Sequence, residues 1–333
     1  METQLKTLPS MTLPDPWGPA AVLDLKELRK HLRPLAYEYW GERRVNDIQT
    51  RMLKLQKGSR CTLEIAMQTE RGWHYLIGKV YSKDRADVFE AMKKIWQSGL
   101  NGEAGFSIPR PITYVSSLHL LLQEKAEGVL AKRVFLDGNP NECAEAAERC
   151  ALWLARFQAA APRQGKIMDI QKILRHGERR LRFIVEAGMP FAAMARKLFE
   201  GLAVSPPVLD TMCAGHGDYK PDHQFLPSQG GTITFDWDCY DIADPCRDAA
   251  LFLIHLHRLS LNRLGASRKL ESASQAFLKT YQAAAQRCVE VGLRFHKAAL
   301  CLQEAKRDVG EQHPGWLKRA AIMLEKGLQE LTA

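Results

Sequence analysis

The periodicity of the apolar residues changes near Gly128, and this change restricts the folds that the chain can adopt. In residues 45–82, apolar and polar residues alternate in RMLKLQ, CTLEIAMQT and WHYLIGKVY. Such alternation is typical of half-buried strands in a meander or in hairpins. Residues 83–99 have helical spacing, and residues 110–125 contain two more strand-like runs. The first part of the chain is therefore predicted to form a small sheet with one helix.

After Gly128 the pattern is almost entirely helical, with strong helical stretches at 141–161 and 166–200 and over most of 246–330. Residues 213–245 are the exception, because HQFLP and TITFD are strand-like and the turn residues PSQGG separate them. This pattern predicts a larger helical lobe that contains a short hairpin.

The N-terminal segment differs from both parts. Residues 1–20 contain four prolines and are predicted to form an irregular arm, and the leucines of residues 21–40 recur at the spacing of an amphipathic helix. The expected boundaries are an N-terminal arm and helix at 1–44, a sheet lobe at 45–125 and a helical lobe at 126–333.

Composition and charge narrow the classes of partner. The chain has 333 residues, of which 46% are apolar, enough for one large domain or two lobes with a packed core. Its formal net charge of +9 favours anionic partners, although a basic surface also serves solubility alone. The most basic stretch, RHGERRLRF at 175–183, holds four arginines but one aromatic residue, which is a weak signal for RNA binding. A nucleic-acid partner is therefore not expected.

The location of the protein is predicted from its cysteines and its hydropathy. The eight cysteines are scattered without a CxxC pair, which is typical of reduced thiols. No uncharged apolar run reaches the length of a membrane span, and the N-terminus lacks the apolar core of a signal peptide. We therefore expect a cytoplasmic protein with no membrane partner. The histidines of HLHR, residues 255–258, face different sides of a helix and are not expected to bind metal.

The residues with the clearest chemistry lie in GHGDYKPDHQFL, residues 215–226, and in TFDWD, residues 234–238. Asp218, in a glycine-flanked turn, can orient a hydroxyl group and accept its proton. Asp236, at the end of an apolar run, can hold Mg²⁺, which prefers oxygen ligands. Lys220 can neutralise a phosphoryl group in transfer. The intervening hairpin returns the chain to its start, so these three side chains are predicted to meet at one edge, as phosphoryl transfer requires.

These motifs resemble those of a known family. HGDYKPDH is similar to the catalytic loop of the protein-kinase-like fold in the form found in aminoglycoside phosphotransferases, and ITFDWD resembles their metal-binding motif. DIADPCRDAALFL resembles the segment that follows, and LIGKVY, FEAMKKIW and LLLQEKAEG resemble, more weakly, the motifs of the N-lobe. The resemblance covers about residues 45–285. It implies an α+β, two-lobed protein-kinase-like fold, with a nucleotide-binding N-lobe and a helical catalytic and substrate C-lobe.

The resemblance also implies roles for individual residues. In the C-lobe, Asp218 would be the catalytic base, Lys220 would contact the γ-phosphate, Asp236 would bind Mg²⁺, and His216 and Asp248 would support the loop. In the N-lobe, Lys79 would hold the α- and β-phosphates and Glu90 would orient Lys79. The remaining nucleotide contacts would come from the loop residues Gly58, Ser59 and Arg60 and from the backbone of Glu124 and Ala126.

One position departs from the family pattern. Where the family has an Asn that binds a second Mg²⁺, this chain has His223. Imidazole suits softer ions than Mg²⁺, so His223 either ligates a metal such as Mn²⁺, or contacts substrate or phosphate, or is structural, or marks reduced activity.

The implied function is an ATP-dependent, Mg²⁺-requiring kinase that phosphorylates a hydroxyl of a small molecule such as a sugar, an amino alcohol or an aminoglycoside. The basic net charge favours a neutral or anionic acceptor over an aminoglycoside. The alternative is a weak or inactive pseudokinase that serves as a nucleotide-binding scaffold. Simpler structural roles also exist, with Asp218 as a turn residue, Lys79 as a solvated edge lysine and Glu90 as a surface partner of Lys94.

Overall fold

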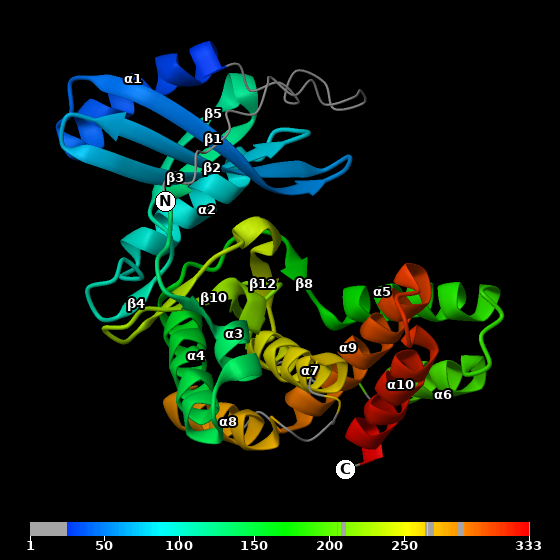
Figure 1. The fold of residues 1–333 in the computed structure, drawn as a ribbon. Helices are drawn as coiled ribbons and strands as arrows, with labels where there is room; N and C mark the ends of the chain where they lie inside the picture. The colour runs from blue at the N-terminus through cyan, green and yellow to red at the C-terminus, as the bar shows by residue number, and fades with distance from the viewer. Residues whose placement is uncertain are drawn as a thin grey trace. The chain divides into compact units, whose positions relative to one another are not determined.

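The computed structural model describes residues 25–204, 206, 207, 211–263, 265, 270–285 and 290–332 (Figure 1). Two compact units make up the chain: Met1–Trp96 with Pro109–Ala126, and Gln97–Ile108 with Glu127–Ala333. The predicted α+β class is confirmed, with a small antiparallel sheet in the first unit and mainly helices in the second. The predicted N-terminal arm and Cys288 lie outside the described residues.

The first unit is built on a five-stranded antiparallel sheet with the order β1-β2-β3-β6-β5. Its elements are α1 (Leu25–Trp40), β1 (Val45–Gln56), β2 (Arg60–Thr69), β3 (Gly72–Tyr81), α2 (Ala86–Gln97), β5 (Pro111–Val115), the 3₁₀ turn η2 (Ser116–Leu118) and β6 (Leu120–Glu124). The interior strand β3 pairs with β2 and β6, and Lys79 on it is only 5% exposed. The interpretation of Lys79 as a solvated edge lysine is therefore wrong.

Helix α1 packs on this sheet through one apolar stripe. Its buried residues Leu28, Leu32, Leu35 and Ala36 recur three or four positions apart, and so lie on one face of the helix. They join a core to which the strands contribute alternate residues such as Ile65. The apolar side chains on one face of α1 therefore pack against the apolar side chains on one face of the sheet and form a single core.

The second unit contains eight helices among the described residues: α3 (Ala131–Asp137), α4 (Pro140–Ala160), α5 (Ile170–Glu186), α6 (Ala192–Val204), α7 (Pro245–Arg263), α8 (Glu271–Ala285), α9 (Glu290–Glu311) and α10 (Trp316–Thr332). Helices α5, α6, α9 and α10 share one apolar core, and Figure 1 shows this group in green and in orange to red. Within the described part of the chain, no helix is long and apolar enough to cross a membrane.

Short strands and turns of the second unit position the motif residues of segments 215–226 and 234–238. They are β4 (Phe106–Ser107), β7 (Val129–Leu130), β8 (Ile167–Met168), β9 (Cys213–Gly215), η3 (Pro221–His223), β10 (Gln224–Leu226), β11 (Thr232–Thr234), η4 (Trp237–Cys239) and β12 (Asp241–Ala243). The predicted hairpin is β10 with β11, and β7 and β4 extend it at either edge. Strands β8, β12 and β9 form a second small sheet.

The start of α4 is closed by a reciprocal cap. The Asn139 side chain accepts hydrogen bonds from the N–H groups of Asn141 and Glu142, and Glu142 accepts one from the Asn139 N–H. These contacts satisfy donors that a helix N-terminus otherwise leaves without partners. The cap therefore stabilises the helix that later contacts the site through Arg149 and Cys150.

We expect Asn139→Ala to lower the free energy of unfolding by about 1 kcal/mol, because α4 loses its capping acceptor. Asn139→Asp is the matched control, since it keeps an acceptor oxygen, and it should unfold close to the wild type. Urea denaturation measures both variants. Equal free energies of unfolding for Asn139→Ala and the wild type would contradict the role of the cap.

Candidate active site

The turn that carries Asp218 is held in place by α7. Asp248, in the first turn of α7, accepts hydrogen bonds from the backbone N–H groups of His216, at 2.7 Å, and Gly217, at 3.1 Å. Gly217 has a φ of +77°, and a Cβ there would lie 2.3 Å from the Cys239 carbonyl oxygen. Any residue with a side chain would be strained here and would clash with Cys239, so this turn requires glycine.

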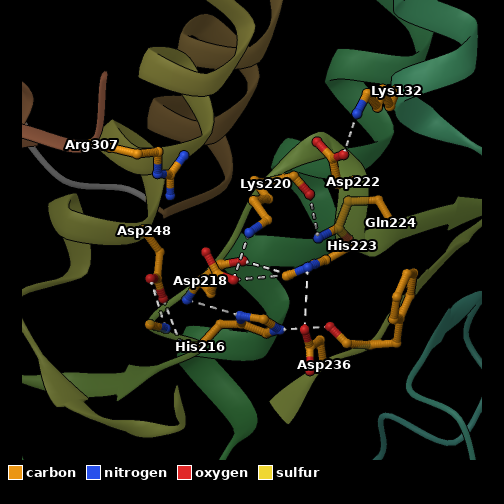
Figure 2. Close-up of polar contacts among 12 residues, drawn as sticks. Lys132, His216, Asp218, Lys220, Asp222, His223, Gln224, Asp236, Asp248 and Arg307 are labelled. Carbon is orange, nitrogen blue, oxygen red and sulfur yellow. Dashed lines mark hydrogen bonds and ion pairs between the residues drawn. The ribbon is translucent and has the colours of Figure 1, made fainter. Parts of the chain in front are cut away.

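His216 joins this loop to the end of β11. Its Nε2 lies 3.0 Å from the Phe235 carbonyl oxygen, which can only accept, so Nε2 carries the proton. Its Nδ1 then accepts a hydrogen bond from the Asp218 N–H at 3.2 Å (Figure 2). Burial lowers the pKa of His216 to about 4. The ring is therefore neutral near pH 7, as the two hydrogen bonds require.

Asp218 lies beside the two other polar residues of its loop. Lys220 Nζ is 2.7 Å from Asp218 Oδ2, and His223 Nδ1 is 2.9 Å from the Asp218 carbonyl oxygen. The predicted proximity of Asp218 and Lys220 is thus observed. The contact between the ammonium group and the carboxylate is a charge-assisted hydrogen bond, which fixes the position of the Asp218 carboxylate.

Asp236 follows β11 in a left-handed backbone conformation, with a φ of 71° and a ψ of 63°. Asp and Asn adopt this region more readily than most residues, and strained positions of this kind cluster at functional sites. The next residue, Trp237, is buried and donates its Nε1–H to the Thr234 carbonyl oxygen at 3.2 Å. The buried indole holds the turn that directs the Asp236 carboxylate.

Asp218, His223 and Asp236 form the one group of candidate metal ligands among the described residues, with their ligand atoms within 4.8 Å of one another. Their donor chemistry fits a divalent cation. His223 Nδ1 faces a carbonyl oxygen and so carries the proton, which leaves a lone pair on Nε2. His223 Nε2 lies 3.3 Å from Asp236 Oδ2, which is also a hydrogen-bond acceptor.

A cation placed between these two facing acceptors would stabilise them. Burial, and next the charge of Lys220, lower the pKa of His223 to about 2. Carboxylate oxygen suits both Mg²⁺ and Mn²⁺, whereas imidazole nitrogen favours an ion softer than Mg²⁺. The arrangement therefore fits a metal site with Asp236 and His223 as ligands.

The predicted nucleotide residues all belong to the first unit. Gly58 has a φ of +72° in the turn between β1 and β2, and the N–H of Ser59 donates to the Gln56 carbonyl oxygen there. Glu90 forms an ion pair with Lys93, Nζ to Oε1 3.3 Å, and is exposed. Arg60 is the first residue of β2, next to this turn. The nucleotide roles of these residues remain predictions.

The backbone of β6 limits how Glu124 can contact a ligand. The N–H of Glu124 donates to the Arg110 carbonyl oxygen at 2.9 Å, so that donor is already used. A contact from the Glu124 backbone to adenine would have to use its carbonyl oxygen. Ala126, two residues further on, is the last residue of the first unit.

Sequence reasoning missed residues that support the hairpin. Arg149 on α4 donates from Nε to the Gly231 carbonyl oxygen and from Nη2 to the Pro227 carbonyl oxygen, both at 2.9 Å. Lys132 on α3 forms an ion pair with Asp222 at 2.5 Å. Neither was foreseen, because an arginine or lysine in a helical stretch looks like a surface residue until its partner is known.

A small antiparallel sheet in the first unit, and a mainly helical second unit that carries Asp218, Lys220 and Asp236, are features of phosphotransferases with a kinase-like fold. Residues 76–298 match the model of the family described as "Phosphotransferase enzyme family", and the chain belongs to this family. The suspected resemblance to aminoglycoside phosphotransferases is thus confirmed. No curated protein sequence matches the chain.

Solved structures show the same fold at low identity. Choline kinase from Cryptosporidium parvum Iowa II is 11% identical, with a TM-score of 0.60 over 91% of this chain and 95% of that one. A thermostable mutant of aminoglycoside phosphotransferase APH(4)-Ia is 14% identical, with a TM-score of 0.57 over 90% and 98%. APH(2")-IIa, in a streptomycin–ATP complex, is 12% identical, with a TM-score of 0.53 over 93% and 97%.

We expect Asp248→Asn to loosen the loop that carries Asp218. An amide has one acceptor oxygen, so one of the N–H groups of His216 and Gly217 would face an NH₂ group and lose its bond. Hydrogen exchange of the peptide over residues 213–220 should become faster, and the free energy of unfolding should fall by about 1–3 kcal/mol. The exposed Asp137→Asn is the matched control. Unchanged exchange in Asp248→Asn would contradict the assigned support.

Proposed function

We propose that this phosphotransferase moves the γ-phosphoryl group of ATP to a hydroxyl group of a small molecule. The observation that carries the proposal is the Asp218 carboxylate, which is paired with Lys220 and lies within ligand distance of His223 and Asp236. A base, a cation and a metal-binding group in one place are what phosphoryl transfer requires. Relatives named for choline and for aminoglycosides, which are hydroxyl compounds, support an alcohol acceptor.

The chemical step follows from the positions of Asp218 and Lys220. Asp218 accepts a hydrogen bond from the acceptor hydroxyl and takes its proton as the oxygen bonds to the γ-phosphorus. The bond from that phosphorus to the β–γ bridging oxygen breaks, and ADP leaves. Lys220, 2.7 Å from Asp218 in the structure, neutralises charge on the transferring group. Binding of Mg²⁺ or Mn²⁺ by Asp236 and His223 would neutralise charge on the phosphates.

The first unit would supply the nucleotide contacts. Lys79 is buried on the interior strand β3, in the segment LIGKVY that resembles the nucleotide-binding strand of the family. We assign it to the α- and β-phosphates, with Glu90 as its orienting partner. The turn at Gly58, Ser59 and Arg60 would cover the phosphates, and the backbone of Glu124 and Ala126 would bind adenine.

The structure favours an active enzyme over a pseudokinase scaffold. The main argument for a pseudokinase is the replacement of Asn by His223. Yet His223 Nε2 lies 3.3 Å from the Asp236 carboxylate, an arrangement that supports a role for His223 as a metal ligand.

All seven cysteines among the described residues are free thiols. Free thiols are typical of a reducing compartment, which supports our assignment of the protein to the cytoplasm.

A direct test incubates the protein with ATP, Mg²⁺ or Mn²⁺ and a pooled set of hydroxyl compounds. Mass spectrometry of the products should show one or more compounds that gain a phosphoryl group while ADP accumulates. ATP that remains intact with every compound and both metals would contradict the proposal and favour the pseudokinase.

Asp218→Asn should retain ATP binding and lower the rate of phosphoryl transfer at least 100-fold, because an amide cannot accept the hydroxyl proton. Calorimetry measures ATP binding, and release of ADP measures transfer. Asp137→Asn, at an exposed position of α3, is the matched control and should keep the wild-type rate. Unchanged turnover in Asp218→Asn would rule out Asp218 as the base.

His223→Asn should shift the metal preference from Mn²⁺ toward Mg²⁺, because an amide oxygen is a harder ligand than imidazole nitrogen. Electron paramagnetic resonance of bound Mn²⁺ measures affinity without any turnover, and competition with Mg²⁺ measures preference. An unchanged preference, together with a higher KM for ATP or for the acceptor, would instead place His223 on a substrate.

A further inference from the structure

An open cavity of about 500 Å³ lies between α5 and α9 in the second unit. Cationic side chains dominate it: its lining includes His176, Arg179, Arg180, Lys306, Arg307 and Glu311. Four of these are permanent cations and one is a carboxylate. We call this cavity the basic groove.

Three cations of the basic groove lack an acidic partner. Within the described part of the chain, no carboxylate lies within ion-pair distance of Arg179, Arg180 or Lys306. Arg180 donates to the Gln303 side chain, and Lys306 Nζ lies 4.5 Å from the ring centre of Phe183. An amide and an aromatic ring do not neutralise a charge as a carboxylate in direct contact does, although Glu304 acts on Arg180 from beyond ion-pair distance. The groove therefore keeps an excess of positive charge that attracts an anion.

The electrostatics of His176 agree with an excess of positive charge. Its pKa is lowered first by burial and then by the charges of Arg180, Arg179, Arg175 and Lys172. No acidic residue is among the causes of this shift. A site in which protonation of a histidine is opposed by four cations is suited to a negatively charged ligand.

The basic groove continues toward the catalytic loop. A second cavity of about 300 Å³ is lined by residues that include Lys220, Asp222 and His255, and Arg307 and Glu311 line both cavities. Figure 2 shows Arg307 extending from α9 toward Lys220 and Asp218. Lys220, whose Nζ is 2.7 Å from Asp218 Oδ2, lines this second cavity together with Arg307, so the second cavity connects the neighbourhood of Asp218 to the groove.

Helix α9 contributes lining residues to both cavities, and helical geometry explains how it does so. Gln303, Lys306, Arg307 and Gly310 recur three and four positions apart and form one stripe along the groove. Asp308 and Glu311 lie on the adjacent stripe, at the second cavity. Arg307 and Glu311 lie at the border between these stripes.

The second cavity itself offers less free positive charge. Arg258 is bound to Asp308 by two hydrogen bonds, at 2.8 and 2.9 Å, and Arg319 is within 3.5 Å of the same carboxylate. Lys132 is paired with Asp222. These cations are already neutralised, so recognition of an anion falls to the basic groove.

We propose that the acceptor is an anionic hydroxyl compound, whose phosphate or carboxylate group binds Arg179, Arg180 and Lys306 while its hydroxyl reaches Asp218 past Arg307. This inference rests on the proposed phosphotransferase function and adds the charge class of the acceptor. It excludes cationic amino compounds, because the same three charges would repel them.

The binding test uses four probes on one carbon skeleton: glucose 6-phosphate, gluconate, glucose and glucosamine. Calorimetry on the full chain, without nucleotide, should show tighter binding of the two anions than of glucose, and the weakest binding for glucosamine. The relative affinities of glucose 6-phosphate and gluconate distinguish a phosphate from a carboxylate ligand. Inorganic phosphate serves as the minimal probe and should bind to the wild type.

The double variant Arg179→Gln with Lys306→Gln should weaken binding of the anionic probes roughly 10- to 100-fold, because two charged contacts are lost. Arg179→Lys with Lys306→Arg keeps both charges and should restore most of the affinity. Arg196→Gln with Lys197→Gln removes two exposed charges from α6 outside the lining and is the matched control. Equal affinity of the first variant and the wild type for inorganic phosphate and both anions would overturn the proposal.

The transfer test separates this inference from the proposed function. With ATP, the anionic probes should be phosphorylated with a higher kcat/KM than glucose, and the double variant should raise their KM while the matched control leaves it unchanged. Transfer to glucose or glucosamine with equal or higher kcat/KM would overturn the anionic class but leave the kinase intact. Anion binding without any transfer or ATP turnover would overturn the acceptor assignment and the proposed function together.

Discussion

The candidate site depends on the two hydrogen bonds of one buried, neutral histidine. His216 accepts from the Asp218 N–H through Nδ1 and donates to the Phe235 carbonyl oxygen through Nε2. It thereby links the loop that holds one carboxylate to the strand end that holds the other. A protonated ring would offer two donors and lose the first bond, so the burial that lowers its pKa also preserves the geometry. Asp248 adds the backbone support from α7.

His223 lies in the same loop but has the opposite tautomer. Its proton is on Nδ1, because the Asp218 carbonyl oxygen lies 2.9 Å away, and its lone pair faces Asp236. One histidine thus serves as a structural link, and the other presents a ligand atom. The difference follows from which nitrogen meets a backbone carbonyl oxygen, since a carbonyl oxygen always selects the protonated nitrogen.

Much of the fold could be predicted because its elements are long enough to show a period. The alternation in WHYLIGKVY predicted β3, and the turn residues PSQGG predicted the β10–β11 hairpin. Strands β4, β7 and β8 have two residues each and carry no period, so the small sheets around the hairpin were missed. The burial of Lys79 was also hidden, because the alternation of a strand does not show whether it has one neighbour or two. The lone pair of His223 depends on a carbonyl contact that no sequence pattern encodes.

The net charge of +9 illustrates the same limit for function, because it sums positive and negative charges without regard to their positions. Arg258 and Lys132 each lie beside a carboxylate, that of Asp308 and that of Asp222, which neutralises them locally. Lys306 contributes an equal charge, but its neighbour is an aromatic ring. Only the charges without a carboxylate beside them attract a ligand strongly, since paired charges are screened at short range. The anionic acceptor that we propose therefore rests on the pairing of the basic residues around α9, which the total charge alone does not reveal.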